Sequence, residues 1–482
     1  MGKLPPLEKV AELPPPPPFN LRNLISMLGV GMIFVSLSLG AGEAVTNPIA
    51  IAKYGPSIMW LATVTILLQI VVNLHVINYT MTAGETIASA FMRIYPRAEI
   101  GAAVVVFMYL LQWAVPTWAV LAGGPLFAII WGRMPTTPAD ENIVAILNAI
   151  VFIISVCILF VGPKIEKVLE YWGWAFTVIS LALLIYVGVL IAPGHTWIEV
   201  AKGAISIGAI PSKPDWFLLG GFAAAAGAGG VCHVALSSWY RDKGYGTASL
   251  AGYIPALIKG KKVHLSAVGK TFEITDKNLS RWKEWWRYVR YDQFGLYLVG
   301  CMLGMLVPAI AVLAVIPVGT TLSGAGVAAA LGNALVPYLG GAAGAFVQVI
   351  MLWILLDTQV TVLDGITRGL TDIIWTISER TRRWAKDDVR RVYYLILGVL
   401  IAWSLVFILG IRVAPAWLAV WLGQAAGINF TILAFHLIFI SRTLPREVRP
   451  PKILFPLVFV AGVWSALFFL LWLLQLTGVI KV

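Results

Sequence analysis

Eleven apolar segments follow one another along this chain of 482 residues, and each is long enough to cross a lipid bilayer. A spanning α-helix needs about 20 mostly apolar residues. Charged residues make up only 12% of the sequence and the mean hydropathy is +0.86, values outside the range of soluble domains. We therefore expect an all-α polytopic membrane protein with spans at residues 24–50, 57–80, 99–130, 143–162, 168–192, 216–238, 293–317, 339–364, 392–411, 415–440 and 453–478.

Lysine and arginine are divided unevenly between the two sides that these spans define. If the N-terminus is cytoplasmic, 29 of the 35 Lys and Arg residues fall on the inner side. The positive-inside rule then predicts a multi-pass protein of the plasma (inner) membrane, with its N-terminus in the cytoplasm and its C-terminus outside. The net charge of +12 is explained by the inner loops. It indicates anionic membrane lipids as partners and not nucleic acid, and it leaves the oligomeric state open.

Two polar regions lie outside the spans. Residues 1–23 are rich in proline, and we expect a disordered cytoplasmic tail there. The longest connection, 241–290, alternates in polarity around Gly269, which predicts a small cytoplasmic β-hairpin. Its last part, RWKEWWRYVR at 281–290, mixes Trp with basic residues. That pattern predicts a short helix at the inner leaflet, which serves either as a plain anchor or as a lipid sensor.

The strongest functional signal is Glu43, which lies in the stretch SLGAGEAVTNP at 38–48 of the first span. An acid deep in a membrane helix is costly and usually functional. The glycines around it and Pro48 predict a break in the helix, which would free backbone carbonyls to bind a ligand. A second glycine-rich stretch, AGAGG at 226–230, interrupts the sixth span. Two broken helices in corresponding halves predict a secondary transporter with its site at the bilayer midplane.

These two stretches also suggest an internal repeat. GAGE at 40–43 and GAGG at 227–230 can be superimposed, and five spans separate them, so equivalent spans run in opposite directions. This arrangement predicts an inverted five-plus-five repeat. The first repeat would cover residues 24–192, the second 216–440 with the insertion 241–290, and an eleventh span 453–478 would follow.

Further polar residues in the spans are candidates for the site. Cys232 and His233 are adjacent, so on a helix they point about 100° apart and cannot easily share one metal ion. Asp357, Thr361 and Asp364 share one helical face. Asp364 precedes Arg368 by four residues, which predicts a structural ion pair. Asp357 lies deeper in the span, and a functional role and a structural role are equally compatible with its position.

The same two readings apply to the remaining candidates. The glycines of the sixth span serve either ligand binding or close helix packing, and Gln424 serves either binding or a hydrogen bond between helices. Carboxylate, carbonyl and amide oxygens are the ligands that hard cations prefer. The candidate ion- or substrate-binding residues are therefore Gly40, Ala41, Gly42, Glu43, Asn47, Ala226, Gly227, Gly229, Cys232, His233, Asp357, Thr361 and Gln424, with Glu43 as the metal ligand.

Four stretches resemble the Nramp (natural resistance-associated macrophage protein) family of divalent-metal transporters. GVGMIFVSLSLGAGE at 29–43 resembles the first span of that family, and TAGETIASAFMR at 82–93 the end of its second. GPKIEKVLEYW at 162–172 resembles the entry to the fifth span, and ALSSWYRDKG at 235–244 the end of the sixth. The count of eleven spans and the expected orientation also match the family.

The chain departs from the family at the residues that bind metal. Gly40 and Glu43 stand where the family has the Asp and the Asn of Asp-Pro-Gly-Asn. An ungapped match through Ser237 gives Gly-Gly-Val-Cys at 229–232 in place of Met-Pro-His-Asn, so the soft methionine ligand is absent. This loss favours a harder cation or another substrate. The third span lacks the family's acids and the ninth its arginine, which argues against proton coupling by the family's route.

The sequence thus predicts a secondary active transporter, not an enzyme, with a LeuT-type inverted-repeat fold. Its substrate would be a small inorganic cation, either a divalent metal of the kind that the resemblance implies or a harder ion such as Mg²⁺ or Mn²⁺, moved by alternating access with no cofactor. Two alternatives stay open. One is an ion-coupled transporter of an organic solute such as an amino acid, and the other is a membrane-embedded enzyme acting on lipids.

Overall fold

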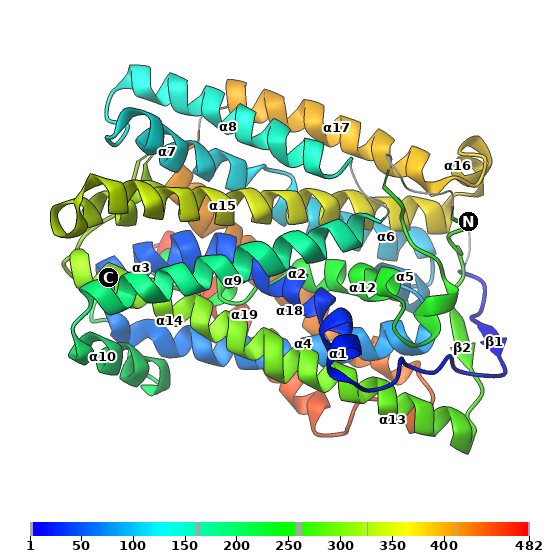
Figure 1. The fold of residues 1–482 in the computed structure, drawn as a ribbon. Coiled ribbons are helices and arrows are strands. Elements are labelled where there is room, and N and C mark those ends of the chain that lie inside the picture. The colour runs from blue at the N-terminus through cyan, green and yellow to red at the C-terminus, as the bar shows by residue number, and fades with distance from the viewer. Residues whose placement is uncertain (1–2, 161–163, 257–262, 325, 412, 481–482) are drawn as a thin grey trace.

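The computed structural model describes residues 3–160, 164–256, 263–324, 326–411 and 413–480, and the protein there is a bundle of helices (Figure 1). Ten helical stretches in these ranges are long and apolar enough to cross a membrane. They are Gly29–Tyr54, Pro56–Ala83, Ala98–Trp131, Pro138–Ile158, Ile165–Ile191, Asp276–Val315, Val327–Ile377, Val389–Gly410, Pro415–Arg442 and Leu454–Leu476.

Half of these ten stretches are built from more than one element. The principal helices are α2 (Gly29–Ser38), α3 (Asn47–Tyr54), α4 (Met59–Ala83), α6 (Ala98–Trp113), α7 (Thr117–Trp131), α8 (Pro138–Ile158), α9 (Ile165–Ile191), α14 (Leu298–Val315), α15 (Ala330–Ile377), α17 (Val389–Gly410), α18 (Pro415–Arg442) and α19 (Leu454–Leu476). Shorter elements are α1 (Leu21–Met27), η2 (Pro56–Ile58), α5 (Ile87–Ile94), α10 (Gly194–Ile205), η3 (Gly246–Leu250), η5 (Val327–Ala329), α16 (Glu379–Trp384) and η6 (Arg446–Val448).

The sixth expected span is interrupted, as the sequence predicts. It consists of α11 (Trp216–Ala225) and α12 (Cys232–Lys243), which are separated by residues 226–231. Three residues of the interruption have positive φ angles: Gly227 at 71°, Ala228 at 57° and Gly230 at 76°. A run of left-handed residues cannot continue a right-handed helix, so the helix stops at Ala225 and restarts at Cys232.

The predicted break in the first span is wrong. Residues 29–54 form one continuous helix, in which α2 passes through a π-helical segment, η1 (Leu39–Thr46), into α3. The N–H of Asn47 donates to the carbonyl of Gly42, so the helix widens and its backbone remains hydrogen-bonded. Pro48 lies in the first turn of α3, where a missing N–H is tolerated. Glycines at 40 and 42 thus accompany a wider turn, not an interruption.

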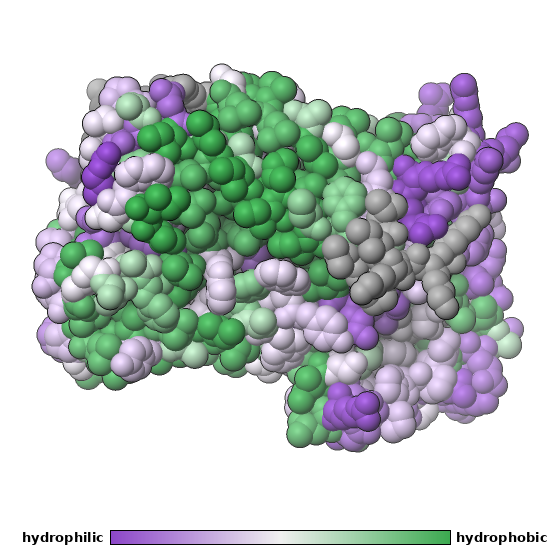
Figure 2. All heavy atoms as spheres, turned by 45° about the horizontal axis from the view of Figure 1, so that its top comes forward, coloured by the Kyte–Doolittle hydropathy of each residue, from purple (hydrophilic) through white to green (hydrophobic). Residues whose placement is uncertain are grey.

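The bundle has an interior and a lipid-facing layer. Figure 1 shows α15 running along the bundle, with α7, α8 and α17 on one side and α2, α9 and α14 on the other. All residues of α2 are buried, whereas α8, α9, α17 and α19 carry exposed large apolar side chains. Figure 2 shows apolar side chains over the middle of one face and hydrophilic ones at the end where α13 (Asp276–Arg290) and α16 lie. This distribution is that of a protein surrounded by lipid.

Residues 8–18 of the N-terminal tail pack against the insertion, which corrects the prediction of a disordered leader for this part of residues 1–23. Residues 8–10 form strand β1 (Glu8–Val10), which pairs in parallel with β2 (Lys270–Phe272). The predicted hairpin within 241–290 is therefore also wrong, since β2 finds its partner in the tail. Leu13 is fully buried, and Trp285 of α13 donates to the carbonyl of Pro14 at 2.9 Å. An extended proline-rich segment makes no hydrogen bonds within itself. Its carbonyl groups therefore accept hydrogen bonds from side chains of α13.

The predicted short helix at 281–290 is part of a much longer one. α13 continues through a second π-helical segment, η4 (Tyr291–Tyr297), into α14. Trp282 and Trp285 are buried, and Trp282 packs against Phe272 of β2. These rings therefore hold the insertion against the bundle, while the basic side chains of Lys283 and Arg287 are exposed.

A buried cluster of charges joins α12 to α15. The guanidinium of Arg368 is fully buried between the carboxylates of Asp242 and Asp364. It lies 3.0 Å from Asp364, which confirms the ion pair predicted from their spacing. Arg241 pairs with Asp372 at 2.5 Å in the same cluster. The second half of the interrupted helix is thereby bound to α15 through charges that have no access to water.

Candidate functional site

Glu43 lies in η1, beside the interruption between α11 and α12. Its side chain is fully buried, and its Oε1 accepts a hydrogen bond from the backbone N–H of Gly227 at 3.4 Å. Among the described residues, its Oε2 has no hydrogen-bond partner and its carboxylate has no ion pair. A lone buried carboxylate is very costly, so it has to be neutralised by a proton or by a bound cation.

A small cavity adjoins the Glu43 carboxylate. Its volume is about 10 Å³, which is room for roughly one water molecule or one small ion. The walls are otherwise apolar, and they come from η1, α9, α14 and α15. The lining residues are Leu39, Glu43, Ala44, Pro48, Leu184, Pro308, Leu331, Met351 and Ile354. The space beside Glu43 is therefore closed to any molecule larger than a small ion.

The carbonyls of Ala226, Gly227 and Gly229 already accept hydrogen bonds from side chains, contrary to the expectation that they would be free to bind a ligand. Side chains from three other helices bind them. Gln69 of α4 donates to Ala226 at 2.8 Å and Tyr297 of η4 to Gly227 at 3.2 Å. Gln112 of α6 donates to Gly229 at 3.0 Å and also accepts from the N–H of Val231 at 2.8 Å. These side chains replace the helical hydrogen bonds that the left-handed residues cannot make.

A second cavity is lined in part by residues of the interruption. Its volume is about 20 Å³, and it is lined by α2, the interruption and α18 together with two residues of the third span. The amide of Gln112 reaches the Cys232 sulfur at 3.8 Å here. The lining residues are Leu37, Ser38, Gln112, Trp118, Ala225, Ala228, Gly229, Cys232, Leu422, Gly423 and Ala426.

His233 belongs to a hydrogen-bond network away from Cys232. Its Nδ1 lies 2.7 Å from Oδ1 of Asn73, whose amide donates to Gln293 at 2.8 Å. Gln293 in turn donates to Asp292 at 2.8 Å, and both lie in η4. The two adjacent side chains thus have different partners: Asn73 for His233 and Gln112 for Cys232.

The other predicted residues surround the site without reaching the Glu43 carboxylate. Asn47 donates to the carbonyl of Met305 at 2.7 Å, and Gln424 donates to that of Phe217 at 2.8 Å. Asp357 lies against Ser36 of α2, and Thr361 is buried one turn further along α15. In the described part of the chain, no hydrogen bond joins any of these four side chains to Glu43.

The glycines of η1 allow close approach of neighbouring helices. A Cβ at Gly40 would lie 1.9 Å from the hydroxyl oxygen of Thr358, and one at Gly42 would lie 2.2 Å from the carbonyl of Ala225. The side chain of Ala41 lies outside the described residues. Gly42 is therefore the point at which η1 touches the end of α11, and this contact brings Glu43 to the interruption.

The donor set is poor in metal ligands. No group of three or more His, Cys, Asp and Glu side chains gathers anywhere in the described ranges. A transition-metal site is usually built from several such ligands. The single carboxylate of Glu43 fits a small hard cation or a proton better than a soft metal.

Sequence reasoning missed the side chains that bind the interruption and those of the network around His233: Gln69, Gln112 and Tyr297 for the first, Asn73 and Asp292 for the second. A usable signal existed for two of them, since Gln69 and Asn73 are polar residues four apart in the second span, on one helical face. Polar residues at such depth are expensive and have partners. Their partners lie more than 150 residues away, so spacing alone could not identify them.

We expect Gly230→Ala to destabilise the protein by about 2–5 kcal/mol, because the residue is left-handed and its surroundings are tight. An added Cβ would lie 2.3 Å from Oε1 of Gln112 and 2.7 Å from Cα of Ala426. Gly478→Ala is the matched control: its φ angle is 74° but the added Cβ meets nothing within 4 Å, so the loss should stay near 1–2 kcal/mol. Thermal unfolding in detergent measures both. Equal losses would contradict close packing at Gly230.

Comparison with known proteins shows the fold. No protein-family model matches the sequence, and no curated protein matches it either. Among solved structures, a manganese transporter from Eremococcus coleocola in complex with an aromatic bis-isothiourea compound superimposes with a TM-score of 0.59 at 12% identity, over 97% of this chain and 90% of the other. Mhp1, a nucleobase-cation-symport-1 family transporter in a closed conformation with bromovinylhydantoin bound, superimposes with a TM-score of 0.52 at 12% identity, over 92% and 90% of the two chains.

These similarities establish a LeuT-type fold for a multi-pass membrane protein, as the repeated glycine-rich stretches predict. The structural neighbours named above are transporters and not enzymes. At this level of identity the likeness is one of fold alone, and substrate has to be argued from the residues of the site.

Proposed function

We propose that this protein is a secondary transporter, related to the Nramp family, that moves a small inorganic cation by alternating access. The observation that carries the proposal is Glu43. Its Oε2 is buried without a partner among the described residues, its Oε1 accepts from Gly227 of the interruption, and the residue lines a cavity of about 10 Å³. A cation or a proton is the partner that such a carboxylate requires.

Charge and size favour a small hard ion. Glu43 supplies oxygen ligands, and the adjoining cavity has no room for an amino acid in this conformation. Asp357 is a second buried acid near α2, and the described residues give it no ion pair. Two such acids would balance the charge of one divalent cation if the conformational cycle brings both to the pathway. The manganese transport of the first structural neighbour supports the same class of substrate.

The interruption supplies a place for movement. The first turn of α11 is held by Gln424 of α18, whereas α12 is held to α15 by the buried charges around Arg368. The two halves of the interrupted helix are therefore bound to different helices, α11 to α18 and α12 to α15. Residues 226–231 connect them through left-handed backbone, so rotation there would open Glu43 to one side and then to the other.

A second candidate is the ion-coupled transport of an organic solute. The second cavity has about 20 Å³ in this conformation and would have to widen for such a solute, but Trp118 gives it an aromatic wall and Ser38 and Gln112 give it polar groups. The organic ligand bound to Mhp1 is consistent with such a site in this fold. A lipid enzyme has less support. Two adjacent acids, Asp387 and Asp388, follow α16 and would be its candidates, but Asp388 is paired with Arg390 at 2.7 Å.

Uptake into proteoliposomes tests the proposal. Purified protein is reconstituted, and vesicles are assayed with Mg²⁺, Mn²⁺, Ca²⁺ and a panel of amino acids under imposed proton and sodium gradients. We expect saturable uptake of at least one cation above protein-free vesicles. Uptake of amino acids without any cation selectivity would establish the second candidate, and no uptake of either class by protein that binds none of them in calorimetry would overturn transport.

A further inference from the structure

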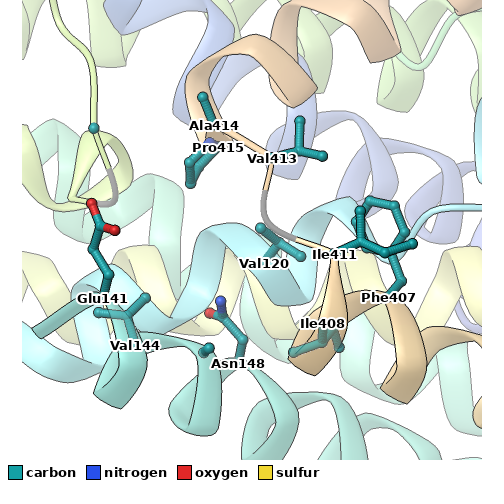
Figure 3. Close-up of a pocket in the computed structure, with 12 residues that line it drawn as sticks. Val120, Glu141, Val144, Asn148, Phe407, Ile408, Ile411, Val413, Ala414 and Pro415 are labelled. Atoms are coloured by element: carbon teal, nitrogen blue, oxygen red, sulfur yellow. The ribbon is translucent and has the colours of Figure 1, made fainter. Parts of the chain in front are cut away.

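A cavity of about 300 Å³ lies apart from the two small cavities described above (Figure 3). It is formed by α7, α8, the end of α17 and the turn that leads into α18. Its walls are mostly aliphatic and aromatic, from Val120, Val144, Ala145, Gly324, Phe407, Ile408, Ile411, Val413, Ala414 and Pro415, with Glu141 and Asn148 as the polar members. It shares no residue with the Glu43 cavity, and its size is at the lower end of that of small-molecule sites.

One face of α8 lines this cavity. Glu141, Val144, Ala145 and Asn148 follow one another at spacings of three, one and three residues, which places them on one side of the helix. Seven residues of helix correspond to about 10 Å, so the two polar side chains mark the two ends of an apolar wall.

Asn148 aims a hydrogen-bond donor into the cavity. The side chain is 5% exposed, and its Oδ1 accepts from the N–H of Gly123 at 2.8 Å. That bond fixes the orientation of the amide, because only the oxygen can accept. The NH₂ group therefore points the other way, and Figure 3 shows the nitrogen directed into the cavity. No hydrogen bond of this nitrogen exists among the described residues, so a ligand acceptor would complete it.

Glu141 places a carboxylate at the opposite end. The neighbouring acid, Asp140, makes the capping box with Thr137 and the ion pair with Arg133 at 2.7 Å. Thr137 and Arg133 thus interact with Asp140 and not with Glu141. Within the described ranges, no ion pair involves the Glu141 carboxylate, which is exposed in the first turn of α8. A cationic group of a ligand would find its counter-charge there.

We propose that this cavity binds an amphipathic organic ammonium ion. The ammonium group pairs with Glu141, an aliphatic or aromatic body lies against Val144, Phe407 and Ile408, and an acceptor oxygen several bonds away receives the hydrogen bond of Asn148. The cavity lies where α8 begins and α17 ends, at the margin of the membrane-spanning region. Amphipathic cations concentrate at that margin. The site is independent of the transport proposed above.

Binding calorimetry with three matched probes tests the charge and the acceptor. The probes are 4-methoxyphenethylamine, 4-ethylphenethylamine, which lacks the ether oxygen, and 3-(4-methoxyphenyl)propionate, which carries the opposite charge. We expect the methoxy amine to bind about tenfold more tightly than the ethyl amine, and the carboxylate not to bind. Arg412, which lies outside the described residues, adjoins Ile411 in the sequence; a preference for the carboxylate would mean that its charge prevails and would overturn the proposal.

Two variants locate the site. Glu141→Gln should weaken the methoxy amine by about tenfold or more. Asn148→Asp keeps the acceptor for Gly123 and removes the donor, so it should abolish the preference for the ether oxygen. Glu199→Gln removes another exposed carboxylate, that of α10, and should change nothing. Unchanged affinity in a folded Glu141→Gln protein, checked by its unfolding temperature, would place the amine elsewhere and refute the assignment.

Discussion

Glu43→Gln removes uptake of the transported cation down to the level of protein-free vesicles. The glutamine has nearly the shape of the glutamate, and its oxygen can still accept from the N–H of Gly227. It has no charge, however, and the cavity beside it offers no other anionic group among the described residues that line it. A cation entering the variant would lose its water without gaining a counter-charge, so its affinity should fall by about tenfold to a hundredfold or more. Initial uptake rates in proteoliposomes measure the effect.

Three comparisons make this result specific. Glu43→Asp retains the charge on a shorter side chain and should keep part of the uptake. Glu284→Gln removes an exposed carboxylate of α13 and should have the rate of the unmodified protein. The unfolding temperature of Glu43→Gln should stay close to that of the parent, since a neutral side chain is easier to bury than a charged one. Normal uptake by a folded Glu43→Gln protein would remove Glu43 from the mechanism.

Arg368→Leu should destabilise the protein by about 3–5 kcal/mol, because it removes the buried cation paired with Asp364 and leaves Asp242 with Arg241 alone. Arg368 and both partners are at most 1% exposed. Tyr393 and Trp239 also donate to Asp364, at 2.8 and 3.0 Å, but neutral donors cannot replace the cation. Thermal or chemical unfolding in detergent measures the loss.

A surface pair with the same spacing provides the control. Arg383 pairs with Glu379 at 3.0 Å, also four residues apart, but the two side chains are 75% and 66% exposed. Arg383→Leu should therefore cost only a few tenths of a kcal/mol. Arg368→Lys keeps the charge while losing the two-pronged geometry, so its loss should be intermediate. Similar losses for the leucine variants at 368 and 383 would show that the buried cluster adds no stability.

Local sequence was sufficient where the outcome depended on residues close to each other. The pair of Asp364 and Arg368 was predictable because one helical turn separates them, and the burial of Glu43 was predictable from its apolar neighbours. The helical spans follow from length and hydropathy for the same reason.

Local sequence failed where distant partners decide. Glycine-rich stretches at 40–43 and 226–230 look alike, yet the first forms a π-helical turn and the second an interruption. The difference lies in the donors: the carbonyls of the interruption are bound by Gln69, Gln112 and Tyr297, which belong to three other helices. The stretch 40–43 instead keeps its own helical bonds. Whether such a glycine-rich stretch forms a π-helical turn or an interruption depends on tertiary contacts, which composition alone does not predict.

The pairing of β1 with β2 has a consequence for how the polypeptide is assembled. About 260 residues separate the two strands in the chain, so at 5–20 residues per second the ribosome needs on the order of 10–50 s between making one and making the other. During that interval five of the ten helical stretches and the interrupted pair α11 and α12 emerge, while residues 8–10 have no partner strand. Residues 8–10 are thus synthesised early but reach their final position late. Before β2 is made, they are more accessible to a cellular protease than in the folded protein.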